Sequence, residues 1–400
     1  MSFKLLSISS MYSGSLELFY EKHPDTAQLT YDQHYSLLMS YTTEFAGSYT
    51  RNFRKLGIDA RCVVANDVLL QNKWKVENIR ALNENKDVLF TQIDSFHPDI
   101  LWIENLDYID NAWFSKVRKE IKSIKLIIAY HCAPYNKLTL EKLRNADSII
   151  TCTPGLKSKF ENEGIKSYLI YHGFDTDLLT RINPENIEPV KDLVFSGSLI
   201  TGGSFHNSRI DLIEKIIADN IDLSLYVTLE NKYKIKAKQL LYHLLEISKK
   251  LRLEKLTDRI PVFEYGRSNV KGYSAKLLES NNPPRYGIDM YNLFNMSKIV
   301  LNIHIGVAGE YAGNMRLFEV TGMGSCLLTD NKRNMPELFD VDKEVVVYDS
   351  PEDCINKIKW LLDNEEERIR IAKAGQKKTL EFHTVEARCK SIIDIINSQI

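Results

Sequence analysis

The feature that most constrains the fold of this chain is a short apolar run without polar alternation, which recurs along its whole length. Leu126–Tyr130 and Ile299–Ile303 are examples. Strands buried on both faces of a parallel sheet have this pattern, and helices between them cover the two faces. The pattern therefore predicts an α/β fold with open parallel sheets. The predicted strands are Lys4–Ile8, Ala60–Ala65, Asp99–Ile103, Leu126–Tyr130, Ser148–Cys152, Ser167–Ile170, Asp192–Gly197, Leu223–Thr228, Val262–Tyr265, Ile299–Ile303, Cys326–Thr329 and Glu344–Tyr348.

The length of 400 residues suits two domains rather than one core. Asn183–Pro189 is polar, holds two prolines and is typical of a linker. We predict a Rossmann-like domain over residues 1–185, a second over 190–380, and a C-terminal helix over 381–400 that crosses back to the first domain. Ligands bind outside the carboxyl ends of strands in such sheets, so two domains facing each other predict an active site in a central cleft.

Two helix boundaries are also predicted from the sequence. The stretch from Tyr49 to Leu56 has a helical pattern and is closed by Gly57, because glycine readily adopts the left-handed backbone that ends a helix. The tail from Glu365 onward is predicted to be wholly helical.

Composition excludes several classes of function. Lys and Arg total 52 against 53 for Asp and Glu, so the chain has no global charge for binding nucleic acid or an anionic membrane. The six cysteines are scattered without metal-binding spacing, which indicates reduced cysteines and no metal cofactor. The apolar start is too short for a secretory signal, and no run is long enough to span a membrane. We expect a cytoplasmic protein.

The segment Asn302–Glu319 is the strongest functional signal. It combines a strand end, a glycine-rich loop with Gly306, Gly309 and Gly313, and a helix predicted to begin near Asn314. Glycines let backbone N–H groups approach a ligand closely, and the first N–H groups of a helix lack partners. This arrangement favours a bound diphosphate. The alternative is a tight turn without a ligand.

Two charged residues follow in the same segment. Arg316 offers a forked cation, and Glu319 lies where a carboxylate can accept hydrogen bonds from a ribose or sugar diol. Together they indicate a nucleotide-sugar site. The alternative is an exposed ion pair, because residues three apart on a helix are neighbours.

The order of these signals resembles the nucleotide-sugar glycosyltransferases of the GT-B fold. More closely, the second half is similar to the CgeB-like branch of the retaining glycosyltransferase group one (family four). The residues that carry the resemblance are Asp192–Ser198, Asn302–His304, Asn314–Glu319, Gly322–Asp330, His383–Thr384 and Arg388, with Tyr130–Cys132 and Tyr171–Asp175 in the first half.

The resemblance implies transfer of a sugar from a nucleotide-sugar donor on the second domain, with retention of configuration and without a metal, in glycan or cell-surface polysaccharide synthesis. The acceptor, a glycan, a lipid-linked molecule or a small molecule, would bind the first domain. Glu319 matches the family's ribose-binding glutamate. Glu310 is the counterpart of its sugar-contacting, catalytic glutamate, although it lies one residue further from Glu319 than in the family motif.

The same resemblance assigns further donor contacts. The N–H groups of Gly313, Asn314 and Met315 match backbone that contacts phosphates or sugar hydroxyls. Gly197 and Ser198 open the second domain at a predicted glycine turn.

Arg209 follows this turn and could neutralise the diphosphate. Its alternative is a solvated residue at the start of a helix over Ile210–Ala218.

His131 directly follows a predicted buried strand and could donate to the donor sugar or polarise the leaving group. Its alternative is a structural histidine. Arg316 would act on the developing charge of the leaving diphosphate, which makes it a catalytic candidate. For His304 the alternation with isoleucines favours a buried, backbone-bonded role, and Asp175 is expected to hold a turn.

Three alternatives stay open at this point. The Lys-rich segment Lys232–Arg259 could lie on an anionic membrane, although a core helix with a basic solvated face is favoured. A nucleotide-sugar epimerase would use the same paired domains. A non-catalytic envelope or spore maturation protein would keep the fold without binding nucleotide.

Overall fold

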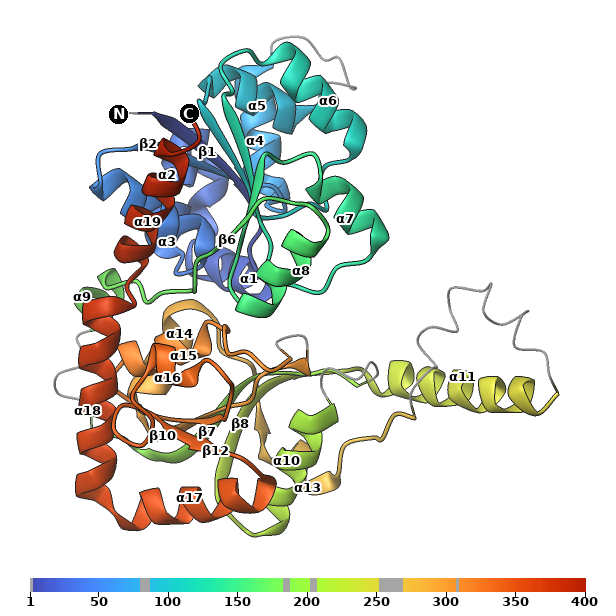
Figure 1. Ribbon diagram of the computed structural model, residues 1–400, viewed down its shortest axis with the longest axis vertical. Helices are drawn as coiled ribbons and strands as arrows, with labels where there is room; N and C mark the ends of the chain where they lie inside the picture. The colour runs from blue at the N-terminus through green and yellow to red at the C-terminus, as the bar shows by residue number, and fades with distance from the viewer. Residues whose placement is uncertain (1–2, 80–86, 183–187, 202–206, 252–268, 307–308) are drawn as a thin grey trace. The chain divides into compact units, whose positions relative to one another are not determined.

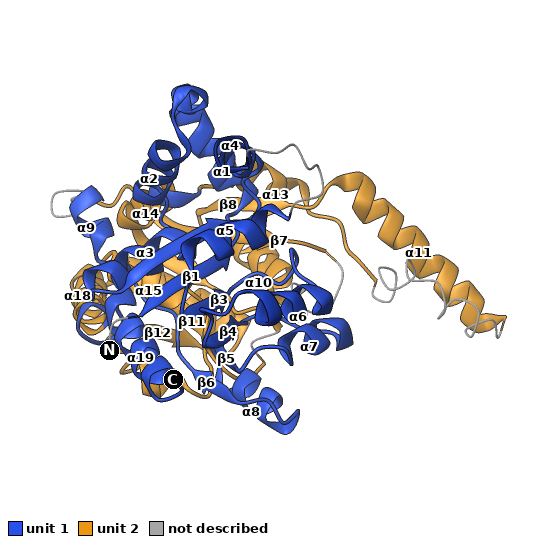
Figure 2. Cartoon of the chain, turned by 90° about the horizontal axis from the view of Figure 1, so that it is seen from above, with its two compact units in different colours: residues 1–182, 286–288, 379–400 blue, residues 183–285, 289–378 orange. Residues whose placement is uncertain are grey.

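A computed structural model of the chain describes residues 3–79, 87–182, 188–201, 207–251, 269–306 and 309–400 (Figure 1). The chain divides into two compact units, coloured separately in Figure 2. Unit 1 comprises Met1–Ile182, Tyr286–Ile288 and Thr379–Ile400, and unit 2 comprises Asn183–Arg285 and Asp289–Lys378. Each unit contains one sheet of six strands, and every strand pairing among the described residues is parallel. The predicted α/β fold with two Rossmann-like domains is confirmed.

The sheet of unit 1 has the strand order β2-β1-β3-β4-β5-β6. Its central strands are buried along their whole length, as the apolar runs predicted. The strands are β1 Lys4–Ser9, β2 Asp59–Val64, β3 Ile100–Ile103, β4 Leu126–Tyr130, β5 Ser148–Thr151 and β6 Ser167–Leu169.

Helices connect the strands of unit 1. As predicted, Gly57 follows the end of α3 and has a positive φ of 81°. The helices are α1 Ser13–Lys22, the 3₁₀ helix η1 Pro24–Gln28, α2 Tyr31–Tyr41, α3 Phe45–Lys55, α4 Val68–Asn78, α5 Val88–Phe96, α6 Asn111–Glu120, α7 Lys137–Leu143, α8 Pro154–Asn162 and α9 Asp177–Ile182.

The C-terminal helix returns to unit 1, as predicted. α18, Glu365–Phe382, runs from unit 2 into unit 1, and α19, Val385–Asn397, packs against α3. α19 buries Val385, Cys389, Ile392 and Ile396 in the core cluster on one face of the unit 1 sheet. The predicted continuous helix is wrong in one detail: it breaks at His383–Thr384, where the Thr384 side chain accepts a hydrogen bond from the backbone N–H of Ala387 and begins α19.

The sheet of unit 2 has the strand order β12-β11-β10-β7-β8-β9. Its strands are β7 Lys191–Leu199, β8 Leu223–Leu229, β9 Asn281–Asn282, β10 Ser297–Asn302, β11 Cys326–Asp330 and β12 Val346–Tyr348. Its other helices are α10 Asn207–Ala218, α11 Lys232–Lys250, α13 Ala275–Ser280, α14 Gly287–Asn295, α15 Arg316–Gly322, α16 Met335–Leu338 and α17 Pro351–Asp363.

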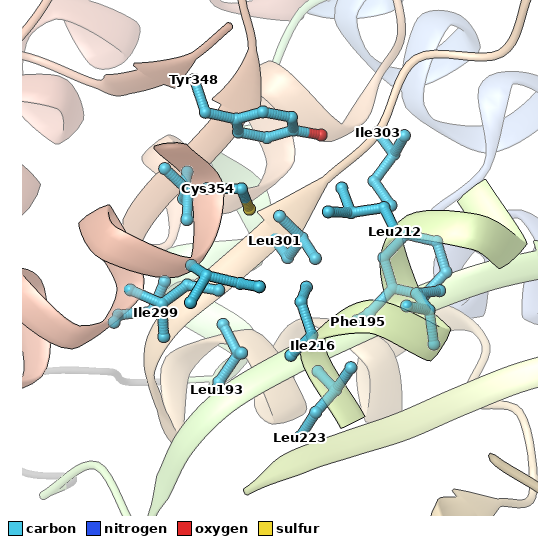
Figure 3. Close-up of a cluster of buried hydrophobic side chains, with 14 of the residues drawn as sticks. Leu193, Phe195, Leu212, Ile216, Leu223, Ile299, Leu301, Ile303, Tyr348 and Cys354 are labelled. Carbon is cyan, nitrogen blue, oxygen red and sulfur yellow. The ribbon is translucent and has the colours of Figure 1, made fainter. Parts of the chain in front are cut away.

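One core of unit 2 forms where α10 and α17 pack on the sheet (Figure 3). Leu193, Ile299 and Leu301 from neighbouring strands are at most 1% exposed, and Ile216 of α10 lies against the same cluster. Burying an aliphatic side chain of this size stabilises the fold by about 1.5–3 kcal/mol. This packing fixes the strand ends that carry the polar residues described below.

Three strand predictions for unit 2 need comment. The predicted glycine turn at Gly197 is wrong, because β7 continues to Leu199 and Gly197 pairs with Val227 of β8. The strand predicted from Glu344 begins two residues later, at Val346. The strand predicted at Val262–Tyr265 lies outside the described residues.

Candidate donor site

Polar groups of unit 2 gather at the carboxyl ends of β7, β10 and β11. These strands are neighbours in the sheet and run parallel, so their ends lie along one edge. Ser198 belongs to the end of β7, Ile303 follows β10, and Asp330 ends β11. Ligands of open α/β sheets bind at this edge.

Arg209, in the first turn of α10, holds two of these strand ends together. Its Nε and Nη2 donate to the Ile303 carbonyl at 2.8 and 2.5 Å, and its Nη1 lies 3.4 Å from the Ser198 carbonyl. Burial and the nearby Arg316 charge lower the pKa of Arg209 to about 10. These hydrogen bonds to strand-end carbonyls do not fit the alternative of a solvated helix residue, and the role of Arg209 in binding the diphosphate stays a prediction.

The predicted donor residues Gly197 and Ser198 lie beside this guanidinium. Both are in β7, where Ser198 supplies its carbonyl to Arg209 and a side chain at position 197 would begin 4.0 Å from Nη1. The two residues therefore form part of the edge as regular strand rather than as a loop.

Glu319 and Arg316 form an ion pair within α15. Arg316 Nη1 lies 2.7 Å from Glu319 Oε2, and the Tyr291 hydroxyl donates to Oε1 at 3.2 Å. The residue Glu319 is only 4% exposed, so the pair is buried and not the exposed pair that spacing alone allowed. The carboxylate is thus fixed in one orientation.

Arg316 connects this pair to the sheet edge. Its Nη2 donates to the Ser196 carbonyl of β7 at 3.2 Å, and its guanidinium lies 4.6 Å from the centre of the Phe294 ring. A guanidinium over an aromatic face is stabilised electrostatically. The geometry makes Arg316 a support for Glu319 and β7 as well as a charge near the strand ends.

Asp330 forms a second buried polar group at the end of β11. It accepts from the backbone N–H of His304 at 2.9 Å and lies 2.7 Å from His304 Nδ1, with Lys332 Nζ at 3.2 Å. Burial alone would raise the pKa of Asp330, but the hydrogen bonds and charges of these partners lower it to about 2. His304 is buried as predicted, although its ring bonds a carboxylate rather than the backbone.

Side-chain amides hold the chain on both sides of Gly313. Asn334 bonds both backbone groups of Ala312, at 2.6 and 3.0 Å. The Asn314 amide donates to the Asn302 side chain at 2.7 Å, which ties the start of α15 to the end of β10. Gly313 is buried between these anchors.

α15 begins two residues after the predicted Asn314, and Met315 is its N-cap residue. The roles of the N–H groups of Gly313, Asn314 and Met315 stay predictions. Of the glycine loop before them, residues 307–308 lie outside the described residues.

Glu310 does not join the buried cluster. Its side chain is 79% exposed and lies 3.9 Å from Arg333 Nη1. The family motif places a sugar-contacting glutamate at this position. The Glu310 carboxylate lies in solvent, however, and is not held by buried contacts like those that fix Glu319.

In unit 1, His131 directly follows β4, as predicted. Its backbone N–H donates to Ile150, and its ring packs against Tyr135 and Phe160, with ring centres 6.3 and 6.1 Å away. Burial lowers the pKa of His131, so the imidazole is neutral at neutral pH. Its catalytic role stays a prediction.

Glu104 is a functional candidate that sequence reasoning missed. It directly follows β3, and Ser9 at the end of β1 donates a hydrogen bond to its carboxyl group. Burial, with a contribution from the Glu44 charge and despite the Ser9 hydrogen bond, raises the pKa of Glu104 to about 8. Strongly shifted carboxyl groups cluster at functional sites. The signal was an acidic residue immediately after a buried strand, the same rule that singled out His131.

α11 covers most of the Lys-rich segment Lys232–Arg259, for which a core helix is favoured over membrane contact. Ile235 and Leu245 are buried, whereas Leu240 and Ile247 are 61% and 53% exposed. The interpretation of α11 as a core helix is therefore only partly confirmed. Residues 252–259 of the predicted segment lie outside the described residues. None of the helices in the described ranges combines the length and apolar character needed to cross a membrane.

Comparison with known families supports the interpretation of unit 2. Residues 249–394, less than half of the chain, match the family described as "Glycosyl transferase-like". This region includes α15 and the ends of β10 and β11. Comparison with curated proteins gives no match.

Several solved structures share the fold. HepE from Anabaena, solved in complex with UDP-glucose, has a TM-score of 0.56 at 12% identity, covering 99% of this chain and 100% of HepE. A glycosyltransferase from Rickettsia africae has a TM-score of 0.52 at 12% identity, covering 100% of this chain and 98% of that chain. Sucrose-phosphate synthase from Thermosynechococcus elongatus has a TM-score of 0.52 at 8% identity, covering 99% and 98%. Likeness at these identities shows the fold, which is GT-B.

The chain therefore has the GT-B fold, and residues 249–394 are similar to a glycosyltransferase-like family. The predicted glycosyltransferase class agrees with both findings.

Proposed function

We propose that this chain transfers a sugar from a nucleotide-sugar donor bound by unit 2 to a hydroxyl acceptor, with retention of configuration and without a metal at the diphosphate. We further propose, from the CgeB-like resemblance, that the reaction belongs to glycan or cell-surface polysaccharide synthesis. The observation that carries the proposal is the buried carboxylate of Glu319, held by Arg316 and Tyr291 beside the carboxyl ends of the strands.

The Glu319 carboxylate suits a ribose diol. A carboxylate accepts up to about four hydrogen bonds, and the Arg316 and Tyr291 contacts use two of them. The remaining positions can accept the two ribose hydroxyls. Because its orientation is already fixed, little side-chain entropy is lost on binding.

The charge at the edge suits a diphosphate. Within the described part of the chain, the Arg209 guanidinium donates to two backbone carbonyls, and no carboxylate forms an ion pair with it. Arg316 is close enough to lower the Arg209 pKa, whereas the Asp330 carboxylate at the end of β11 raises it, so the two guanidiniums supply positive potential at the ends of β7 and β10. A departing nucleoside diphosphate gains negative charge, which this potential stabilises more in the transition state than in the ground state.

HepE was solved with UDP-glucose on the same fold, and this supports a UDP-sugar as the first donor to test. The proposed test is calorimetric titration with UDP, GDP, TDP, ADP and CMP, followed by assay of the sugar nucleotide of the tightest binder. We expect Glu319→Gln to weaken nucleoside diphosphate binding about 10–100-fold, because one or two charged hydrogen bonds are lost.

Glu366→Gln, an exposed change on α18, is the matched control and should bind like the unaltered chain. Glu310→Gln tests the other glutamate of the family motif. Unchanged affinity in Glu319→Gln would refute the ribose assignment. Isomerisation of the sugar nucleotide without acceptor would instead favour an epimerase, and turnover that requires added Mg²⁺ or Mn²⁺ would contradict transfer without a metal at the diphosphate.

A further inference from the structure

Two cysteines and a histidine, far apart in the sequence, meet at the carboxyl edge of the unit 1 sheet. Cys132 lies just after β4, Cys152 directly after β5, and His172 just after β6. One ligand atom from each lies within 4.8 Å of the other two. These three strands are consecutive in the sheet and parallel, so the residues that follow them are brought together by the fold itself.

The distances suit a single metal ion. Zinc binds thiolate sulfur at about 2.3 Å and imidazole nitrogen at about 2.0–2.1 Å, so two ligand atoms of one tetrahedral ion are separated by about 3.5–3.8 Å. Cys132, Cys152 and His172 therefore need only small side-chain adjustments to share an ion. Two sulfurs and one imidazole select zinc-like metals over magnesium or calcium, which prefer oxygen ligands.

The surroundings hold the histidine in place. The Tyr130 hydroxyl lies 3.1 Å from His172 Nδ1, and Arg388 Nε donates to the His172 carbonyl at 3.0 Å. Hydrogen bonds of this kind orient the imidazoles of metal sites. Cys152 is buried, whereas Cys132 and His172 are half-buried, which provides a path for an ion to enter.

We propose that Cys132, Cys152 and His172 form a site for a thiophilic divalent metal ion of the zinc class. Three protein ligands leave the fourth tetrahedral position for water or a substrate hydroxyl. The site belongs to unit 1, whereas the candidate donor residues belong to unit 2, so it does not rest on the proposed function. The metal ion proposed here is therefore separate from the donor diphosphate, at which we propose that no metal binds.

The test measures metal content and affinity of the full-length chain. The chain is incubated with zinc sulfate under reducing conditions, desalted and analysed by mass spectrometry of the elements. We expect an equimolar amount of zinc to remain bound. Cobalt(II) in place of zinc should give the intense sulfur-to-metal absorption and the visible bands of a tetrahedral thiolate site.

Variants locate the ion. Cys132→Ala and His172→Gln should lose the equimolar zinc and the cobalt spectrum, and Tyr130→Phe should weaken zinc affinity about tenfold through the orienting hydrogen bond. Cys62→Ala, which changes another buried cysteine of unit 1, is the matched control and should retain both signals. Circular dichroism of each variant verifies folding. Cys132 and His172 are half-buried, so their substitution should disturb the fold less than substitution of the buried Cys152.

Three results would overturn the proposal. The first is an unaltered chain that retains no zinc. The second is equal zinc retention in Cys132→Ala and the unaltered chain. The third is a Cys132–Cys152 disulfide, found by peptide mass mapping in protein purified under reducing conditions. The two sulfurs would then form a structural disulfide and could not bind a metal ion as thiolates. Nucleotide binding is measured separately, so failure of the donor proposal would leave these outcomes unaffected.

Discussion

The raised pKa of Glu104 predicts that unit 1 loses stability as the pH rises. The carboxyl group has an ordinary pKa of 4.5 and a pKa of about 8 in the folded protein. The folded state therefore keeps its proton between these values, whereas the unfolded chain has already lost it. The stabilising contribution is complete below about pH 4.5 and is lost as the pH approaches 8.

The size of the effect follows from the same values. Each pKa unit corresponds to 1.36 kcal/mol, so the change from 4.5 to about 8 sets an upper limit of about 5 kcal/mol. Relaxation and water penetration reduce such penalties in real proteins. We expect the free energy of unfolding of the unaltered chain to fall by about 2–3 kcal/mol between pH 5 and pH 8, relative to Glu104→Gln, which cannot ionise.

The assay is urea unfolding followed by tryptophan fluorescence. Every protein in this comparison also carries Trp360→Phe. The remaining tryptophans, Trp74, Trp102 and Trp113, all lie in unit 1, so the fluorescence reports on the unfolding of unit 1. Other titrating groups are common to both proteins and cancel in the difference. Glu120→Gln, an exposed change on α6, should show no pH-dependent difference. A constant difference between the unaltered chain and Glu104→Gln across this pH range would refute the reasoning.

Three further predictions concern unit 2. Asp330→Asn should lower the free energy of unfolding by about 2–3 kcal/mol at pH 7, measured by urea unfolding. Because the Asp330 pKa is lowered in the folded protein, this loss should shrink as the pH falls from 3.8 toward 2. Asn314→Ala removes the amide contacts to Asn302 and should both lower stability by about 1 kcal/mol and weaken nucleotide binding in calorimetry. Gly375→Ala should destabilise by about 1–3 kcal/mol in thermal unfolding, against the usual helix preference for alanine, because its Cβ would lie 2.3 Å from the Glu344 carbonyl oxygen; a higher melting temperature would contradict this.

The strands could be predicted because burial on both faces leaves a local signature. Leu126–Tyr130 and Ile100–Ile103 are apolar at every position, and both are central strands. β9 left no such signature, since it consists of Asn281 and Asn282 at the sheet edge, where their side-chain amides bond the backbone of β8. The turn predicted at Gly197 was wrong for a related reason: pairing with β8 carries the strand onward, and a partner strand is not visible in the local sequence.

The candidate sites were predictable where their residues are neighbours in the sequence. Arg316 and Glu319 share one helix turn, so their ion pair could be considered in advance, although its burial depends on Tyr291 and β7. The cluster of Cys132, Cys152 and His172 could not be found from spacing. Its members follow three different strands, and only the order of those strands in the sheet makes them neighbours.

The two sheet edges differ in how they handle ionisable groups, and this difference bears on the proposed division of labour. In unit 1, burial favours the neutral forms of Glu104 and His131, the residues that directly follow two central strands. In unit 2, the Arg209 guanidinium stays charged at the strand ends. A neutral, hydrogen-bonding edge suits the hydroxyls of an uncharged sugar acceptor, whereas a positive edge suits a diphosphate. A diphosphate in unit 1 would meet no cation at these two neutral residues, whereas in unit 2 it would meet the Arg209 guanidinium, so the charge distribution supports the donor in unit 2 and the acceptor in unit 1.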